Sequence, residues 1–277
     1  MARLKILDRF DSPVREASGL CCFDLDGAEQ LAVVGDRDSV LAWAPITPDG
    51  PGQWRTLALT ELPGAPADVG QLEAVAAAGD GRVVVLGEEP ALLVLVDVAG
   101  SVIEGWWHIS TAESPDFAQL WDRDDNSRGE GLQLLPDGHA LVIKEKDPVV
   151  IVEVGPDATR ASLDWQSMPA TWDAPAGHSL RPVHWLDIDS APGDLSDCEV
   201  VDGVLYAISD QDRCLVQLRH DQESLVVGES WKLDEKVEKP EGLAVTAGRE
   251  WYVAMDTGNA AGAIVRIRPP GNQRPLA

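Results

Sequence analysis

The stretch GEGLQLLPDGHALVIKEKDP, residues 129–148, decides the fold because it recurs along the chain in recognisable form. It opens with an acid, Glu130, passes through an Asp-Gly pair, and ends an apolar run at a second acid, Glu145. An Asp-Gly pair between strand-like apolar runs is the strongest short-range signal of a β-hairpin. The stretch therefore predicts one hairpin with an acid at each of its two open ends.

Five copies of this hairpin follow one another along the sequence. When they are aligned on the first acid, four copies carry an acid and the first copy carries a serine. This inner column consists of Ser18, Glu73, Glu130, Asp197 and Glu241. The acids that close the hairpins form a second column, Asp36, Glu88, Glu145, Asp210 and Asp256. The two columns stay 13 to 18 residues apart in every copy, so the repeat is a structural unit.

The repeats predict an all-β protein. They start 44 to 67 residues apart, and a four-stranded propeller blade takes about 40–50 residues. We therefore predict a β-propeller of five blades, or of six if a degenerate blade lies within 155–194, closed by the N-terminal strand at residues 4–10. Residues 1–277 form a single domain, with long loops at 101–128 and 155–194. A short helix is expected only at 115–121, PDFAQLW.

The charge balance restricts the partners. The chain carries 22 Lys and Arg against 47 Asp and Glu, a formal net charge of −25. Nucleic acids and anionic membrane surfaces would be repelled by such a protein. No apolar run approaches the roughly 20 residues that span a bilayer, and the first residues do not resemble a secretory signal. We expect a cytoplasmic protein that acts on a small molecule, with an oligomeric state that the sequence does not define.

The inner column has two interpretations. In a propeller the first strand of each blade lines the central channel, so acids at the strand starts converge at one mouth. Their mutual repulsion is relieved by a divalent cation, and oxygen-only ligands from separate blades suit Ca²⁺ better than Mg²⁺ or Zn²⁺. The alternative is that these polar residues form hydrogen bonds between neighbouring blades and bind no metal.

The repeated motifs resemble the SdiA-regulated family and its relatives, the esterase-like phytases. The matching stretches are 71–89, 129–148, 195–213 and 240–258, with EASGL at 16–20 fitting the first blade. The resemblance implies a propeller with a metal, Ca²⁺ preferred, at the central mouth. It implies as metal ligands Glu73, Glu130, Asp197 and Glu241, with Glu16 as a further candidate. Ser18 departs from the pattern, which leaves the ring of acids incomplete in the first blade.

Two Trp-rich and His-rich segments lead into Glu130 and Asp197, and long connections of this kind are often functional. A wall of such residues beside a metal would form a substrate pocket. The candidates for substrate binding are Trp107, Trp121, Arg123, Arg181 and Trp185. The candidates for general acid–base catalysis are His108, His178 and His184. The alternative is that the Trp residues pack onto the propeller and the His residues lie on the surface.

These observations favour a metal-dependent enzyme, a hydrolase of the phosphoesterase or lactonase kind or a lyase, acting on a small anionic substrate. The alternative is a binding or scaffold propeller with a structural metal. The long loops distinguish the two: Trp and His side chains that face the mouth favour an enzyme, and Trp side chains that pack against the sheets favour a binding protein.

Overall fold

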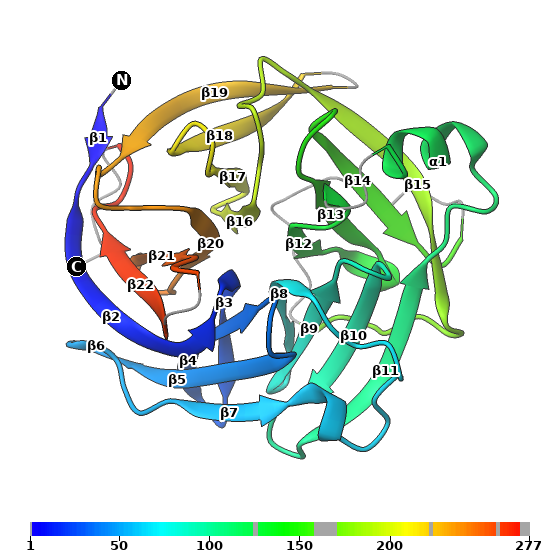
Figure 1. Cartoon of the computed structure of the whole chain (residues 1–277), viewed down its shortest axis with the longest axis horizontal. Helices are drawn as coiled ribbons and strands as arrows, with labels where there is room; N and C mark the ends of the chain where they lie inside the picture. Colours follow the sequence, from blue (N-terminus) through cyan, green and yellow to red (C-terminus); the bar gives the residue numbers. More distant parts are fainter. Residues whose placement is uncertain (1, 124–126, 158–170, 222–223, 259–260, 272–277) are drawn as a thin grey trace.

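The computed structural model describes residues 2–123, 127–157, 171–221, 224–258 and 261–271. More than half of these residues belong to β-strands, which form a ring of sheets around a central axis (Figure 1). Figure 1 shows one strand of each group nearest the centre and one at the rim. The described part of the chain is therefore an all-β ring, as the repeat predicts.

Antiparallel pairing divides the described strands into five groups. The first contains β3 (Ala17–Leu25), β4 (Ala28–Gly35), β5 (Val40–Thr47) and β7 (Arg55–Ala58), with the short β6 (Gly50–Pro51) beside β5. The second contains β8 (Leu72–Gly79), β9 (Arg82–Gly87), β10 (Leu92–Asp97) and β11 (Val102–Ile109). The third contains β12 (Gly131–Leu134), β13 (Ala140–Lys144), β14 (Val150–Gly155) and β15 (Ser179–Asp189).

The fourth group contains β16 (Asp197–Val201), β17 (Val204–Ser209), β18 (Cys214–Asp221) and β19 (Ser224–Leu233). The fifth joins the two ends of the sequence: β20 (Pro240–Val245), β21 (Trp251–Met255) and β22 (Ala261–Ile267) are completed by β2 (Ile6–Arg15). The predicted closure by the N-terminal strand is thus observed. The short β1 (Arg3–Leu4) pairs in parallel with β19.

The choice between five and six blades stays a prediction. Residues 158–170, within the stretch where a sixth blade was considered, lie outside the described residues. The flanking residues belong to the third group, because β15 pairs with β14 along most of its length. The helix expected at 115–121 is present as α1 (Pro115–Trp121), and 3₁₀ turns occupy Leu59–Glu61 and Pro136–Gly138.

The hydrophobic core consists of five clusters, each lying between two neighbouring groups of strands. Most strands are therefore covered on both faces, and they read as continuous apolar runs such as VVVLG rather than as alternating patterns. The hairpin turns follow the sequence signal: Asp80 and Gly81 both have positive φ, as do Asp202 and Gly203. Positive φ at both central residues is the conformation that the Asp-Gly pair favours in two-residue hairpins.

The inner strands of neighbouring groups approach each other closely, which explains why a glycine follows the inner-column residues Ser18 and Glu241. A Cβ atom on Gly19 would lie 2.6 Å from the Cα of Ala74, on the inner strand of the next group. A Cβ on Gly242 would lie 2.9 Å from the backbone oxygen of Ser18. These contacts are with backbone, which cannot move aside as a flexible side chain does. The glycines that follow Ser18 and Glu241 are thus a packing requirement of the ring.

We predict that Gly19→Ala lowers the free energy of unfolding by about 1–3 kcal/mol, the usual cost of overpacking. The matched control is Gly70→Ala, because a Cβ there would meet only the Ser39 hydroxyl at 3.5 Å. Urea unfolding of the two variants and the wild type checks this. Equal midpoints for Gly19→Ala and the control would contradict the packing argument.

Candidate functional site

The inner-column residues occupy β-bulges at the start of the inner strands. On β3 the pairing with β4 passes from Ala17 to Gly19 and skips Ser18. On β8 it skips Glu73 in the same way, and on β20 it skips Glu241. A bulge re-aims the side chain of the unpaired residue. Because three groups carry the same bulge at the same place, these three side chains occupy equivalent positions around the axis.

The other two groups show the equivalent position through backbone hydrogen bonds. The Glu130 N–H donates to the Ile143 carbonyl at 3.1 Å, while Gly131 is the residue paired with Ile143. In the fourth group the Ser196 N–H donates to the Ile208 carbonyl at 2.9 Å, while Asp197 is the residue paired with Ile208. Ser196, not Asp197, is therefore the structural counterpart of Glu130. The inner ring of this structure consists of Ser18, Glu73, Glu130, Ser196 and Glu241.

Asp197 has a different environment from the one that the sequence alignment predicts. Its side chain is buried and accepts backbone N–H groups from three inner strands. Oδ1 accepts from Cys198 at 2.8 Å, and Oδ2 accepts from Leu243 at 2.8 Å and from Leu20 at 3.5 Å. The edges of inner strands present N–H groups without ladder partners. Asp197 satisfies such groups on β3 and β20, and so links the fourth, fifth and first groups.

Burial and like charge act together on the three glutamates of the inner ring. Burial, followed by the charges of Asp36 and Glu88, raises the pKa of Glu73 to about 8. Burial and the charge of Asp210 raise the pKa of Glu241 to about 8. Burial raises the pKa of Glu130 well above its ordinary value, and the charge of Glu73 adds to this effect. The three carboxyl groups thus lie within range of one another's charge.

The second column lies at the same end of the axis, as the hairpin topology predicts. Its backbone N–H groups return to the chain just before the inner ring: Asp36 donates to the Glu16 carbonyl at 3.3 Å, and Asp256 donates to the Lys239 carbonyl at 3.0 Å. Glu88 donates to the Gln71 carbonyl at 3.0 Å in the same way. Glu16, Gln71 and Lys239 all have positive φ, which shows one repeated turn. We call this end of the ring, with its two columns, the acidic end.

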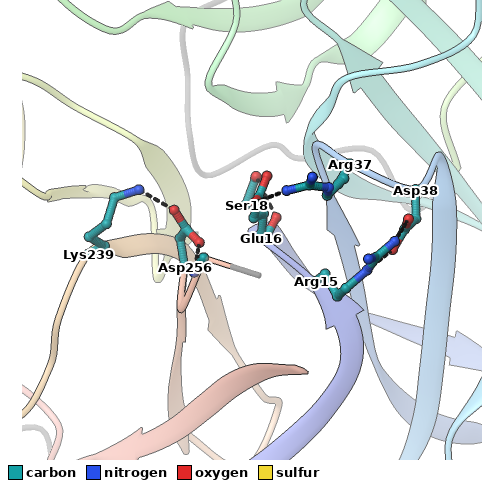
Figure 2. Close-up of polar contacts among 8 residues, drawn as sticks. Arg15, Glu16, Ser18, Arg37, Asp38, Lys239 and Asp256 are labelled. Carbon is teal, nitrogen blue, oxygen red and sulfur yellow. Dashed lines mark hydrogen bonds and ion pairs between the residues drawn. The ribbon is translucent and has the colours of Figure 1, made fainter. Parts of the chain in front are cut away.

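Basic side chains border the acidic end. Arg37 pairs with Glu16 at 2.8 Å, and Lys239 pairs with Asp256. Figure 2 shows these two ion pairs facing each other, with Ser18 beside Glu16. The side chains of Arg37 and Lys239 remain about half exposed, at 47% and 55%. A small ligand that approaches the acids from solvent therefore meets cations as well.

The donor set at the acidic end has the chemistry of a site for a hard divalent cation. Carboxylate oxygens are the ligands that Ca²⁺ prefers, and a cation would relieve the repulsion that raises the pKa of Glu73 and Glu241. Within the described residues, however, no three His, Cys, Asp or Glu side chains stand close enough together to hold an ion. The residues therefore fit a cation by type, and their side chains would have to move closer together to hold one.

The structure does not place the three predicted histidines beside the acidic end. His108 lies on β11, the outer strand of the second group, where its Nε2 is 3.7 Å from Asp68 Oδ2. His178 precedes β15 and stacks on Trp106 with ring centroids 4.3 Å apart. His184 lies on β15, which is the outer strand of the third group. General acid–base catalysis by these three residues at the acidic end has no support in this arrangement.

The predicted substrate-binding residues pack mainly into the core. Trp107 and Trp121 are buried at 3% and 2% exposure between the second and third groups. Trp185 packs half-buried against the same cluster. Arg181 pairs with Glu113 at 2.7 Å, and Arg123 is exposed after α1. The Trp side chains therefore support the packing alternative.

Ser196 is the functional candidate that the sequence alignment missed. The alignment chose the acid of the fourth repeat, and this gave the shortest distance between columns, 13 residues where three other copies have 15. That irregularity was the one sequence signal of a shifted register. Lys239 was missed because its relation to Asp256 arises from a turn that only the structure shows.

Comparison with known proteins agrees with the fold. The model of the SdiA-regulated family matches residues 59–256, more than half of the chain, so the chain belongs to the SdiA-regulated family. This confirms the resemblance carried by the repeated motifs. No curated protein sequence matches the chain. No helix among the described residues is both long enough and apolar enough to cross a membrane.

Several solved structures share the fold at low sequence identity. Glutaminyl cyclase of Myxococcus xanthus is 14% identical, with a TM-score of 0.55 over 96% of this chain and 97% of the other. The calcium-binding protein regucalcin of Agrobacterium tumefaciens is 10% identical, with a TM-score of 0.54 over 97% of each chain. The PQQ-bound aldose sugar dehydrogenase of Streptomyces coelicolor is 13% identical, with a TM-score of 0.50 over 96% and 97%. These likenesses identify a propeller-type fold.

The raised pKa values predict a pH dependence of stability. The folded pKa of Glu73 and Glu241 is about 8, above the ordinary value of 4.5, so between these pH values the folded state binds more protons than the unfolded state. The stability contributed by these groups is complete below about pH 4.5 and is lost as the pH rises toward 8. We predict that the melting temperature in excess chelator falls between pH 5 and pH 8.5. Each kcal/mol lost from the free energy of unfolding lowers it by about 2–4 °C.

The double variant Glu73→Gln/Glu241→Gln is the control for this pH dependence. It lacks both titrating groups and keeps their size, so its melting temperature should fall much less over the same range. An equally steep fall in the double variant would assign the pH dependence to other groups.

Proposed function

We propose that this chain is a propeller that binds a divalent cation, Ca²⁺ preferred, at its acidic end, and that a small anionic ligand binds there with the cation. The observation that carries the proposal is the placement of Glu73, Glu130 and Glu241 at equivalent positions, two of them on β-bulges, with their carboxyl groups within range of one another's charge. Three carboxylates from three separate groups of strands are a donor set for a hard cation.

The basic residues that border the acidic end support the proposal that the ligand is an anion. Arg37 and Lys239 are half exposed beside the inner ring, although the chain as a whole carries a net charge of −25. An anion would be repelled by the protein at long range, and these two side chains together with a bound cation reverse the sign locally. Each basic side chain already has a carboxylate partner, so an anion would bind by bridging the cation and the exposed guanidinium or ammonium group.

The first test is cation binding. We expect Ca²⁺ to raise the melting temperature of chelator-treated protein. At about 100 times its Kd a ligand adds roughly 2.7 kcal/mol of stability. Glu130→Gln should remove most of this shift, and in chelator at pH 8 it should melt higher than the wild type, because one repelling charge is gone. Asp202→Asn, an exposed acid on the β16–β17 turn, is the matched control.

Failure of Ca²⁺, Mg²⁺ and Mn²⁺ alike to shift the melting temperature would overturn the cation site. A shift of equal size in Glu130→Gln and in the wild type would place the cation elsewhere on the acidic surface. Either result can be read from a single set of melting curves with direct calorimetric titration of Ca²⁺.

A second candidate function, a metal-dependent hydrolase or lyase, is favoured by the second column. Burial raises the pKa of both Glu88 and Asp210 above their ordinary values, next to the glutamates of the inner ring. A raised pKa makes a carboxyl group a stronger base than an ordinary carboxylate, and proton transfer is the role that the sequence assigned to the histidines. Glu73, Glu130 and Glu241 would hold the cation, which supplies polarisation of a substrate oxygen when bound.

We predict that any Ca²⁺-dependent turnover of phosphoesters or lactones is lost in Glu130→Gln. Glu88→Gln should keep Ca²⁺ binding, lose turnover by at least tenfold and change the pH profile. The variant His178→Ala is the control and should turn over as the wild type does, since His178 lies at the rim. Loss of turnover in His178→Ala with full activity in Glu88→Gln would reverse the assignment.

A further inference from the structure

A cleft of about 500 Å³ lies where the ring closes, between the fifth group and the first. The first group contributes Glu29 at the start of β4 and Ile46 near the end of β5. The fifth group contributes the β20–β21 turn, residues 246–250, with parts of β2 and β22. This turn is the closed end of the hairpin whose open end carries Glu241 and Asp256. The cleft, which we call the closure cleft, therefore lies at the end opposite the acidic end.

Apolar side chains supply part of the lining of the closure cleft. They include Leu7 of β2, Ile46 of β5 and Pro269, which follows β22. In the described part of the chain, Leu7 is the one exposed large hydrophobic side chain, at 49%. Cavities of about 300–1,000 Å³ that combine apolar walls with a few polar groups are typical small-molecule sites. The closure cleft therefore has the size and the apolar surface to hold the body of a small ligand.

Two carboxylates supply the polar part of the lining. Glu29 Oε1 accepts the backbone N–H of Ala247 at 2.6 Å, which holds this side chain of the first group against the turn of the fifth. Within the described residues, Glu29 Oε2 has no hydrogen-bond partner and is not buried from solvent. Glu250 is fully used, because Oε1 accepts from Arg266 at 2.6 Å and Oε2 accepts from the Tyr252 hydroxyl at 3.3 Å. One oxygen of Glu29 is thus open to a ligand.

The basic side chains at the closure cleft are already neutralised. The Arg266 guanidinium donates to Asp8 on one side and to Glu250 on the other. Arg249 pairs with Asp202 of the fourth group. Two guanidinium groups thus stand among four carboxylates, which are Asp8, Glu29, Asp202 and Glu250. An anionic ligand would have to displace a carboxylate here, whereas a cationic ligand would reduce the excess of negative charge.

We infer that the closure cleft is a second binding site and that it takes an organic ammonium ion with an apolar body. The ammonium group would donate to the open oxygen of Glu29, and the apolar body would cover Leu7 and Ile46. Ordering a ligand here would not disturb the ring closure, because the Glu29–Ala247 hydrogen bond uses the other carboxylate oxygen. The inference is independent of the cation site proposed above, since the two ends of the ring share no residue.

Titration of the full chain with phenethylammonium in excess chelator, followed by saturation-transfer NMR, tests this inference. The matched probes are hydrocinnamate, which has a similar body and the opposite charge, and phenethyl alcohol, which has no charge. We expect the ammonium ion to bind more tightly than either of them. Equal or tighter binding of hydrocinnamate or of the alcohol would overturn the ligand class. Absence of binding by all three probes would overturn the site.

Two variants locate the bound ammonium ion. Glu29→Gln keeps an oxygen that can accept from Ala247 and removes the charge, so it should weaken phenethylammonium binding by about two- to fivefold and melt like the wild type. Leu7→Ala should weaken binding of the same probe by about fivefold because apolar contact is lost. Asp26→Asn, an exposed acid on the β3–β4 turn at the same end, is the matched control and should bind like the wild type.

The acidic end is the competing place for an ammonium ion, and Glu130→Gln tests it. This variant should bind phenethylammonium like the wild type, because Glu130 lies at the other end of the ring. Loss of binding in Glu130→Gln, with full binding in Glu29→Gln and Leu7→Ala, would move the ammonium ion to the acidic end and overturn the closure cleft as its site.

Discussion

The close approach of the inner strands at the centre of the ring is the constraint on which the rest of the structure depends. At Gly19 and Gly242 the backbone of the neighbouring group leaves no room for a Cβ atom. The chain meets this constraint with a bulge followed by a small residue. The bulge turns the preceding side chain, Glu73 or Glu241, away from the crowded interface between groups. An acid followed by a small residue, as in Glu73-Ala74 and Glu241-Gly242, thus lets neighbouring strands pack closely and presents a polar group at the bulge.

The inner edges create a second requirement, since their N–H groups have no strand to pair with. Asp197 shows how one group solves it: a single buried carboxylate accepts N–H groups from β16, β20 and β3. This arrangement places a carboxyl group in the core, where burial raises its pKa well above the ordinary value, while the ring glutamates lie at the acidic end. An acid at the ring position, such as Glu130, lies at the acidic end, whereas an acid one residue later in the repeat, Asp197, binds backbone N–H groups. The strand register therefore decides which of these two roles an acid takes.

Aromatic packing, rather than polar side chains, joins the second and third groups toward the rim of the ring. Trp107 and Trp172 are in edge contact with ring centroids 5.3 Å apart, and the centroids of Phe117 and Trp121 on α1 are 5.2 Å apart. The aromatic residues that suggested a substrate wall thus fasten two groups of strands together. The acidic end is built from side chains near the axis, and its chemistry is that of carboxylates, serine hydroxyls and two exposed basic groups.

Much of this protein follows from the sequence alone. The repeat spacing, the Asp-Gly turns and the continuous apolar runs determined an all-β ring closed by its N-terminal strand, because these signals are local and recur along the chain. The helix at Pro115–Trp121 and the convergence of both acid columns at one end were predictable for the same reason. Glu73, Glu130 and Glu241 were found because a repeated acid stands out against a variable background.

Only the tertiary structure decided whether Ser196 or Asp197 occupies the ring position. It also decided whether the predicted histidines and tryptophans lie at the rim or at the centre. A one-residue shift in register reverses which way a side chain points, and one sequence does not reveal such a shift. Whether a Trp lines a site or fills a seam depends on which neighbouring group covers it, a long-range property that local pattern does not encode. The sequence thus determined which kinds of groups are present and how often, and the packing of the ring determined which of them face the axis.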